Sequence, residues 1–531
     1  MKLLFPLSVT LVLQLPLCSS FNILGLTPLP ALLGRMITTG VVSSEDIIQE
    51  QYKPDPQDYG AYPDGAVMTP VLIARKFPGL KFSPAIMSDL SPPSERKSSI
   101  KRKLLRLGLS VKRKLSPGFA YTKPWTQEGV HYPDWCKDLS DGMEPERPED
   151  LNMEDQIAGM AHRGPFSVYF QYDNHSDEYV LDLSVLESAE PREPFVAAGG
   201  VARVVKDGES FRTSEVSFRG DVSRPGEKNW ELFQKRFLVG LNTYATALDH
   251  LTHMHIIGAG TFSICTISTL PPEHPLRILL QPFVIETNTV NNNNINGLIQ
   301  TEQDNVPSYT GYKLDTINSL MRNTTMNFDI SYLDPEQRFQ KYGQRQDLKS
   351  FPTVESLLEI FGMFKKFTNG WVDQHVENVD EATRNWVREL DNHIPNGVLG
   401  LVGISSTDEL TTKHVAHIAA TFMFTASVWH HVVADMTSDY FMQFDAMPPS
   451  MNSDGHTTFG VMLEKRNSIL VAALLRYKLV SEIDYYEDES MKELWNGFQS
   501  DLKGYSSTLD SKGESRHYYI DPRVVPSSIH A

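Results

Sequence analysis

Thr421-Phe422-Met423-Phe424-Thr425-Ala426-Ser427-Val428-Trp429 is apolar on nearly every side, and His430 and His431 follow it directly. Such a run predicts a central helix that is buried all round. A histidine at this place needs a hydrogen-bond partner or a metal ion, because burying an unsatisfied polar group is costly. Taken alone, the stretch leaves both roles open for His430.

A second group of histidines, His250, His253 and His255, lies in another helical pattern. In a regular α-helix, residues five apart point about 140° away from each other. A π-turn brings them onto one face, and π-turns tend to occur at functional sites. We therefore predict that His250 and His255 face one ion while His253 points elsewhere. A histidine-rich surface helix is the plainer alternative. The motif lacks the Glu of His-Glu-x-x-His, which disfavours a zinc protease.

The last residues, His517 to Ala531, have the character of a segment that threads back into the protein. Its terminal carboxylate would add an oxygen ligand to the three histidines. Imidazole nitrogens with a carboxylate oxygen suit iron or manganese, whose higher coordination numbers leave positions for water and substrate. The ligand types alone do not choose between these two metals.

Length and charge narrow the class of protein. With 531 residues, the chain is long enough for a substantial core. Its net charge of -17 at pH 7 argues against a nucleic-acid partner, because phosphate binding depends on Lys and Arg.

The amino-terminal residues 1–20 predict a secretory signal peptide. Lys2 precedes an apolar run over residues 3–17, and Cys18-Ser19-Ser20 supplies the small residues of a cleavage region. An uncleaved membrane anchor is the alternative, although the run is short for a bilayer. The expected location is therefore outside the cell.

Two further features agree with secretion. Asn174 and Asn323 begin glycosylation sequons. After removal of the leader, Cys136 and Cys265 remain, enough for one disulfide in an oxidising compartment. Whether they pair stays open.

The chain divides into a basic segment and a large domain. Residues 21–120 have the composition of an irregular linker or pro-segment, with basic residues concentrated between Arg96 and Lys114. They predict a processing site, a peripheral membrane contact through residues 100–115, or a solvated basic helix. Residues 121–531 are assigned to the large domain. Strands are expected at residues 166–170 and 201–205, and helices at 230–267, 354–371, 380–390, 407–436 and 457–480.

Several motifs resemble the lipoxygenase family, over roughly residues 196–531. The most specific is His274-Pro275-Leu276-Arg277-Ile278-Leu279-Leu280-Gln281-Pro282, continued by Thr287, Asn291 and Leu298-Ile299. It is similar to the family's His-Pro, Leu-Leu, Thr, Asn and Leu-Ile pattern. Ala426-Ser427-Val428-Trp429-His430-His431 resembles Ala-Ser-x-x-His, with a double histidine similar to that of secreted fungal members. Tyr518 to Pro522 with Pro526-Ser527-Ser528 resembles the family's approach to a terminal carboxylate.

The resemblance implies a mainly α fold: a large helical lipoxygenase-like catalytic domain with a small β-containing portion near its start. This is the compact secreted form without the amino-terminal β-barrel, expected as a monomer. It implies His250, His255, His430 and the α-carboxylate of Ala531 as metal ligands. Iron is predicted, with manganese as the alternative. No side chain is predicted to be catalytic, because a metal-bound hydroxide would take the hydrogen.

The implied reaction adds molecular oxygen to a polyunsaturated fatty acid that contains a cis,cis-1,4-pentadiene, and it yields a hydroperoxide. An apolar tunnel is expected, with Leu279, Phe422, Phe424 and Trp429 as candidate walls and plain core as their alternative role.

Three positions depart from the family pattern. Ala434 stands where the family has an Asn ligand, so water would substitute, or Asp435 if His431 replaced His430 in the site. The helix after His255 is one residue longer than usual. Asn294 stands where the family has a small residue beside the substrate channel. Two alternatives to the dioxygenase therefore stay open. Ala434 and Asn294 would suit a fatty-acid hydroperoxide isomerase, and Ala434 together with the changed terminal residue, Ala531, would suit an inactive secreted lipid-binding homologue.

Overall fold

The computed structural model describes residues 147–529, except residues 286, 289, 292–298, 300–304, 442, 444–445, 454–477 and 482–484. The predicted signal peptide, the basic segment, Cys136, Asn294 and Ala531 therefore lie outside the described residues. So does all but the end of the helix predicted at 457–480.

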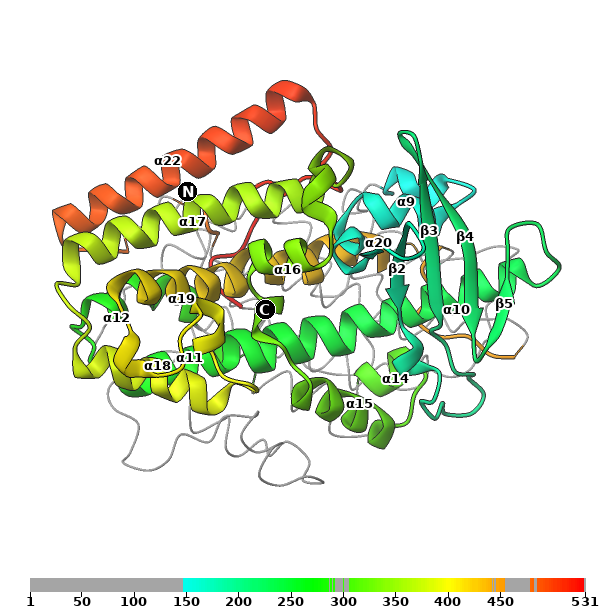
Figure 1. The fold of residues 1–531 in the computed structure, drawn as a ribbon, viewed down its shortest axis with the longest axis horizontal. Coiled ribbons are helices and arrows are strands. Elements are labelled where there is room, and N and C mark those ends of the chain that lie inside the picture. Colours follow the sequence, from blue (N-terminus) through cyan, green and yellow to red (C-terminus); the bar gives the residue numbers. More distant parts are fainter. Residues whose placement is uncertain are drawn as a thin grey trace, which may run out of the picture.

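Helices form most of the described chain. In Figure 1, α22 lies over α17, which lies over α19, and a long rod made of α10, η6 and α11 runs beneath them. The α- and π-helices are α9 (Gln156–His162), α10 (Trp230–Thr243), η6 (Tyr244–Gly260, π), α11 (Thr261–Thr269), α12 (Pro275–Val284), α14 (Asn305–Thr310), α15 (Leu314–Met326), α16 (Pro335–Lys341), α17 (Pro352–His375), α18 (Glu381–His393), α19 (Thr412–Phe424), η11 (Thr425–Trp429, π), η12 (Val432–Met436, π), α20 (Thr437–Phe441) and α22 (Glu489–Lys512).

Short 3₁₀ turns connect these helices. They are η3 (Glu149–Asn152), η4 (Pro165–Tyr169), η5 (Ser184–Leu186), η7 (Ile330–Tyr332), η8 (Gln344–Ser350), η9 (Leu399–Val402) and η10 (Thr407–Glu409).

A small antiparallel sheet stands at one end of the helical body, with α9 and α10 packed against it (Figure 1). Within the described chain its order is β1 (Gln171–Asp173), β2 (Glu178–Asp182), β3 (Val201–Asp207), β4 (Ser210–Phe218) and β5 (Asp221–Ser223). Burial alternates along β3, with Ala202 and Val204 inside and Arg203 outside, as expected for a sheet with one solvated face. Arg203 lies within 4 Å of the carboxylates of Glu178 and Glu215.

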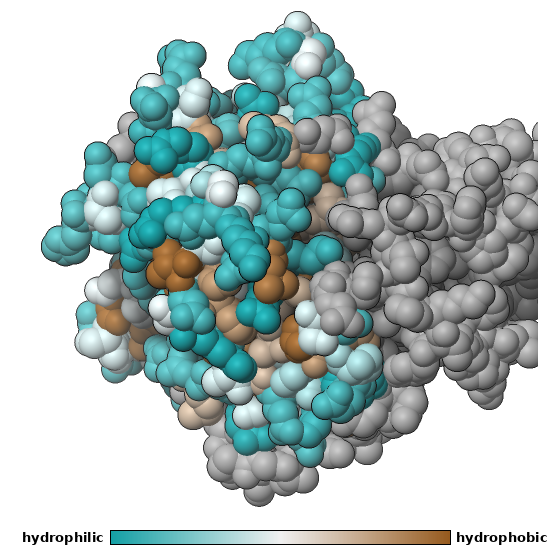
Figure 2. All heavy atoms as spheres, turned by 90° about the vertical axis from the view of Figure 1, so that its right-hand side faces the viewer, coloured by the Kyte–Doolittle hydropathy of each residue, from teal (hydrophilic) through white to brown (hydrophobic). Residues whose placement is uncertain are grey.

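The face that carries this sheet is largely hydrophilic, with hydrophobic side chains in small separate groups (Figure 2). The described helices include none with the length and apolarity needed to cross a bilayer.

Most of the predicted elements are confirmed. The strand predicted at 166–170 is wrong: residues 165–169 form η4, and Phe166 to Phe170 are all buried, so the sequence alternation has no exposed side. Pro165 begins this turn, and Ser167 Oγ donates to Gly164 O at 2.7 Å. The helix predicted from residue 407 begins at Thr412, because Thr411 caps it by accepting from His414 N.

A buried carboxyl group joins three distant parts of the chain. Asp150, in η3, accepts hydrogen bonds from Tyr440 Oη of α20 at 3.1 and 3.0 Å, and Tyr518 Oη of the carboxyl-terminal segment lies 3.4 Å from the same carboxyl. Asp150 is fully buried. Burial raises its pKa to about 6, although the hydrogen bonds from the tyrosines oppose this shift.

Asp150→Asn is expected to stabilise the protein near neutral pH. Folding raises the pKa of this carboxyl, so its contribution to the free energy of unfolding is greatest below its unfolded pKa, near 4. That contribution is lost as the pH rises through the folded pKa of about 6. The advantage of the variant in unfolding free energy should grow by roughly 2 kcal/mol between pH 4.5 and pH 7.5. Urea unfolding at both pH values measures it, with the exposed Asp373→Asn as control. A pH-independent difference would refute this assignment.

Candidate metal centre

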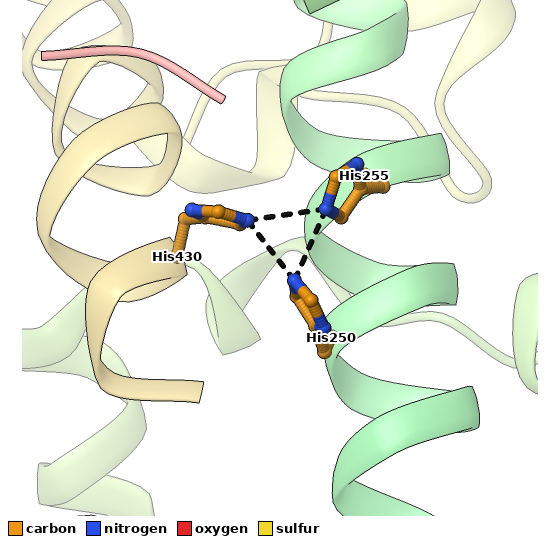
Figure 3. Close-up of side chains that lie close together, drawn as sticks. All are labelled: His250, His255 and His430. Atoms are coloured by element: carbon orange, nitrogen blue, oxygen red, sulfur yellow. Dashed lines mark hydrogen bonds between the residues drawn. The ribbon is translucent and has the colours of Figure 1, made fainter. Parts of the chain in front are cut away.

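Three imidazole rings from two helices point at one another in the core (Figure 3). The Nε2 atoms of His250 and His430 are 3.0 Å apart, and each lies 3.1 Å from Nε2 of His255. His255 and His430 are buried, and His250 is partly buried. Within the described chain, these residues form the one cluster of His, Cys, Asp or Glu side chains with ligand atoms close enough to hold a metal ion.

The helix that carries His250 and His255 is π-helical from Tyr244 to Gly260, as their spacing predicted. Two buried threonines support the wide turns: Thr252 Oγ1 donates to Ala247 O at 2.8 Å, and Thr261 Oγ1 to Ile256 O at 3.1 Å. Both acceptors lie five residues earlier, where π-turns leave carbonyl groups that a side chain can satisfy.

His253, three residues after His250, points away from the cluster, as predicted. Its Nδ1 donates to Oδ1 of the fully buried Asp249 at 3.1 Å. Its ring lies 4.6 Å from that of Tyr332.

Asn291 fixes the orientation of His255. Its Oδ1 lies 2.7 Å from His255 Nδ1, and its Nδ2 donates to His255 O at 2.8 Å. The second bond fixes which way the Asn291 amide faces, because the backbone oxygen of His255 can only accept a hydrogen bond. Asn291 Oδ1 therefore faces His255 Nδ1 and accepts a hydrogen bond from it, so the proton of His255 is on Nδ1 and His255 Nε2 presents a lone pair to the cluster. Asn291 belongs to the motif quoted above, but no local feature of the sequence indicates this contact.

Asn291→Ala is expected to weaken metal binding by about 10- to 100-fold, the usual cost of losing a partner that orients a metal-binding histidine. Asn291→Asp keeps an acceptor for His255 Nδ1 and should lose less affinity. A chelator competition assay on the purified variants measures the change. Equal affinity in wild type and Asn291→Ala would contradict the orienting role.

The spacing of the nitrogens tests which ion the cluster fits. Two nitrogens about 2.1 Å from one ion are about 3.0 Å apart at an angle of 90° and about 3.4 Å apart in a tetrahedron. The observed 3.0 to 3.1 Å is short enough for one ion to contact all three nitrogens. Imidazole nitrogens together with oxygen ligands suit iron or manganese, so the residues present fit the predicted group.

The second histidine of the pair has another partner. His431 Nδ1 donates to Asp435 Oδ2 at 2.7 Å. The predicted alternative, in which His431 and Asp435 replace His430, is therefore wrong, because His430 faces His250 and His255. Ala434 lies in η12 and is 8% exposed, and its methyl group cannot coordinate.

The described end of the chain reaches the interior beside α12. Ser528 Oγ donates to Ile285 O at 2.8 Å, and Ile529 is fully buried. Leu479 N donates to Val525 O at 2.8 Å. Such anchoring fits a segment that threads inward, as predicted, while the ligand role of Ala531 and the channel role of Asn294 stay predictions.

Two of the candidate tunnel residues, Phe422 and Phe424, pack against other rings. Phe422 stacks on Phe262 with ring centres 5.0 Å apart, and Phe424 lies edge-on to Phe361 at 5.1 Å. These contacts favour the core role that the sequence left open for them. Cys265 is a buried free thiol in α11.

No family model and no curated protein matches the sequence. Solved structures do match the fold. A coral 8R-lipoxygenase aligns with 83% of this chain and 76% of its own length, at 14% identity and a TM-score of 0.70. A LOX deletion variant in complex with arachidonate gives the same coverage and identity with a TM-score of 0.69. A fungal lipoxygenase from Fusarium graminearum aligns with 80% of this chain and 89% of its own length, at 13% identity and a TM-score of 0.60.

Proposed function

We propose that this chain, which has the lipoxygenase fold, is a secreted, monomeric metal-dependent dioxygenase that adds molecular oxygen to polyunsaturated fatty acids. The observation that carries the proposal is the convergence of three Nε2 atoms within 3.1 Å in a buried site. A related structure holds arachidonate, which supports this substrate class. The predicted leader, residues 1–20, supports secretion.

His250, His255 and His430 would hold the ion, with the terminal carboxylate as an oxygen ligand. When bound, iron or manganese would supply the one-electron chemistry that removes a hydrogen from the bis-allylic carbon. Iron remains our first expectation and manganese the alternative.

The chain's own contribution is to orient the ligands and to keep water out. Asn291 holds the proton of His255 on Nδ1, so that Nε2 is available as a ligand. The residues near the three histidines along both helices include buried apolar side chains, among them Leu251, Met254 and Val433. A dry environment suits radical chemistry because it limits side reactions of the reactive intermediate.

The direct test is oxygen uptake and conjugated-diene absorbance with linoleate, using protein whose iron and manganese contents have been measured. The proposal expects both signals, in proportion to the bound metal. Absence of both from metal-loaded protein would contradict dioxygenation.

A hydroperoxide isomerase is a second candidate. It is favoured by the buried methyl group of Ala434 four residues after His430, where an oxygen ligand is absent. Purified linoleate hydroperoxide, supplied without oxygen, separates the two activities: the isomerase consumes it, and the dioxygenase needs fatty acid and oxygen. An inactive lipid-binding protein would do neither and would bind fatty acid without metal.

A further inference from the structure

A buried arginine lies between the two helical segments that supply the histidines. Arg338, in α16, is 1% exposed. Its guanidinium carbon lies 3.7 Å from the ring centre of Tyr332 and 4.6 Å from that of Trp429. Nη2 donates to Val168 O at 2.8 Å, whereas Nε and Nη1 donate to no residue in the described part of the chain. The side chain is therefore held mainly by stacking on aromatic rings.

Asp249 provides a balancing charge on the first segment. It directly precedes His250, and its Oδ1 accepts from His253. The Arg338 guanidinium stacks on the ring of Tyr332, which lies 4.6 Å from the ring of His253, so stacked side chains connect Arg338 to the first segment. The positive charge of Arg338 also attracts the Asp249 carboxylate, and each offsets part of the other's desolvation cost.

Trp429 provides the contact on the second segment. It directly precedes His430 and is fully buried. Its Nε1 donates to Leu333 O at 2.9 Å, and its ring lies 5.8 Å from that of Phe339. Arg338 thus interacts with the residue before a metal-facing histidine on each of the two segments.

These segments need support from outside. The first is π-helical, and the second has π-turns directly before and after His430 and His431. Such turns are rare and local in proteins. Ligand atoms must be held to within about 0.5 Å for one ion to contact them all. On this side, a cavity of about 180 Å³ lies next to Arg338 and is lined by Tyr244, His253, Tyr332 and Tyr342 among others. Close packing therefore does not fix the segments here as it does in the surrounding core.

We propose that Arg338 is a positioning residue that sets the distance between His430 and His250. It does so by stacking against Trp429 and by offsetting the charge of Asp249. The inference rests on the proposed metal site but requires no particular substrate.

The test compares Arg338→Met with Arg277→Met. Arg277 is also buried, at 2% exposure, but it donates to the carbonyls of Thr266 and Leu270. Each purified variant is stripped of metal and titrated with Mn²⁺, while electron paramagnetic resonance counts the free ion and records the spectrum of the bound ion. Thermal unfolding of the metal-free proteins reports their stability.

Arg338→Met is expected to raise the Kd for Mn²⁺ about 10- to 100-fold and to change the spectrum of the bound ion. Arg277→Met should lower the unfolding temperature but change the Kd less than about threefold, with the wild-type spectrum. Equal changes of Kd in both variants would overturn the proposal. Wild type that binds no Mn²⁺ would instead contradict the metal site itself.

Two further variants separate charge from stacking. Asp249→Asn combined with Arg338→Met removes the unbalanced carboxylate, so this protein should bind Mn²⁺ more tightly than Arg338→Met alone. Additive losses would exclude the charge role. Arg338→Lys keeps the positive charge but lacks the flat guanidinium. It also replaces Arg338→Met in the Mn²⁺ titration if that variant does not fold. Wild-type affinity in Arg338→Lys would exclude the stacking role.

Discussion

Replacing His430 with Gln is expected to reduce bound iron or manganese to background and to abolish fatty-acid oxygenation. His430 Nε2 contacts the Nε2 atoms of both other histidines, at 3.0 and 3.1 Å. Losing a partner outside the ligand set costs about 10- to 100-fold in metal affinity, so losing a ligand should cost more than that. Metal content and diene formation in the purified variant measure the two effects.

The neighbouring histidine is a matched control. His431 lies in the same helical path and is similarly buried, but it is bonded to Asp435. His431→Gln should therefore keep its metal and most of its activity. If His431→Gln loses metal while His430→Gln keeps it, the assignment of the site is wrong.

Gly260→Ala is expected to damage the centre from within its helix. Gly260 has helical φ and ψ angles of -64° and -51°, so alanine would ordinarily stabilise this position by about 1 kcal/mol. A Cβ here would overlap His255 O and would lie 2.8 Å from Asn291 Nδ2. Relieving these contacts must move the turn of His255 or its hydrogen-bond partner. We expect a loss of roughly 1 to 3 kcal/mol in stability and at least tenfold weaker metal binding.

Gly362→Ala tests the reasoning in the opposite direction. Gly362 lies in α17, is exposed, and would place its Cβ more than 4 Å from other atoms. This variant should gain up to about 1 kcal/mol and keep wild-type metal affinity. The comparison needs only chemical unfolding and metal titration of both variants. A stabilised Gly260→Ala protein with unchanged affinity would show that the π-turn tolerates a side chain.

The parts of the site that could be predicted from sequence have local signals. The apolar run before His430 indicated a buried helix, and the five-residue spacing of His250 and His255 indicated π-turns, because a regular helix would separate them. The carboxyl-terminal motif indicated a segment that returns to the interior, and Ser528 and Ile529 are buried there.

The parts that could not be predicted depend on residues far apart in the chain. Asn291 contacts His255 across 36 positions, and Arg338 meets Trp429 and Asp249 from a separate helix. A buried arginine has no periodic signature of its own. The strand expected at residues 166–170 failed for a related reason: the alternating pattern assumed one exposed face, whereas neighbouring helices cover the whole segment.

Anomalous diffraction from crystals of the purified protein, at the iron and manganese absorption edges, would test the metal centre most directly. We expect one strong peak, at one of the two edges, about 2.1 Å from the Nε2 atoms of His250, His255 and His430. A protein that oxygenates linoleate but shows no such peak among these nitrogens would contradict the account.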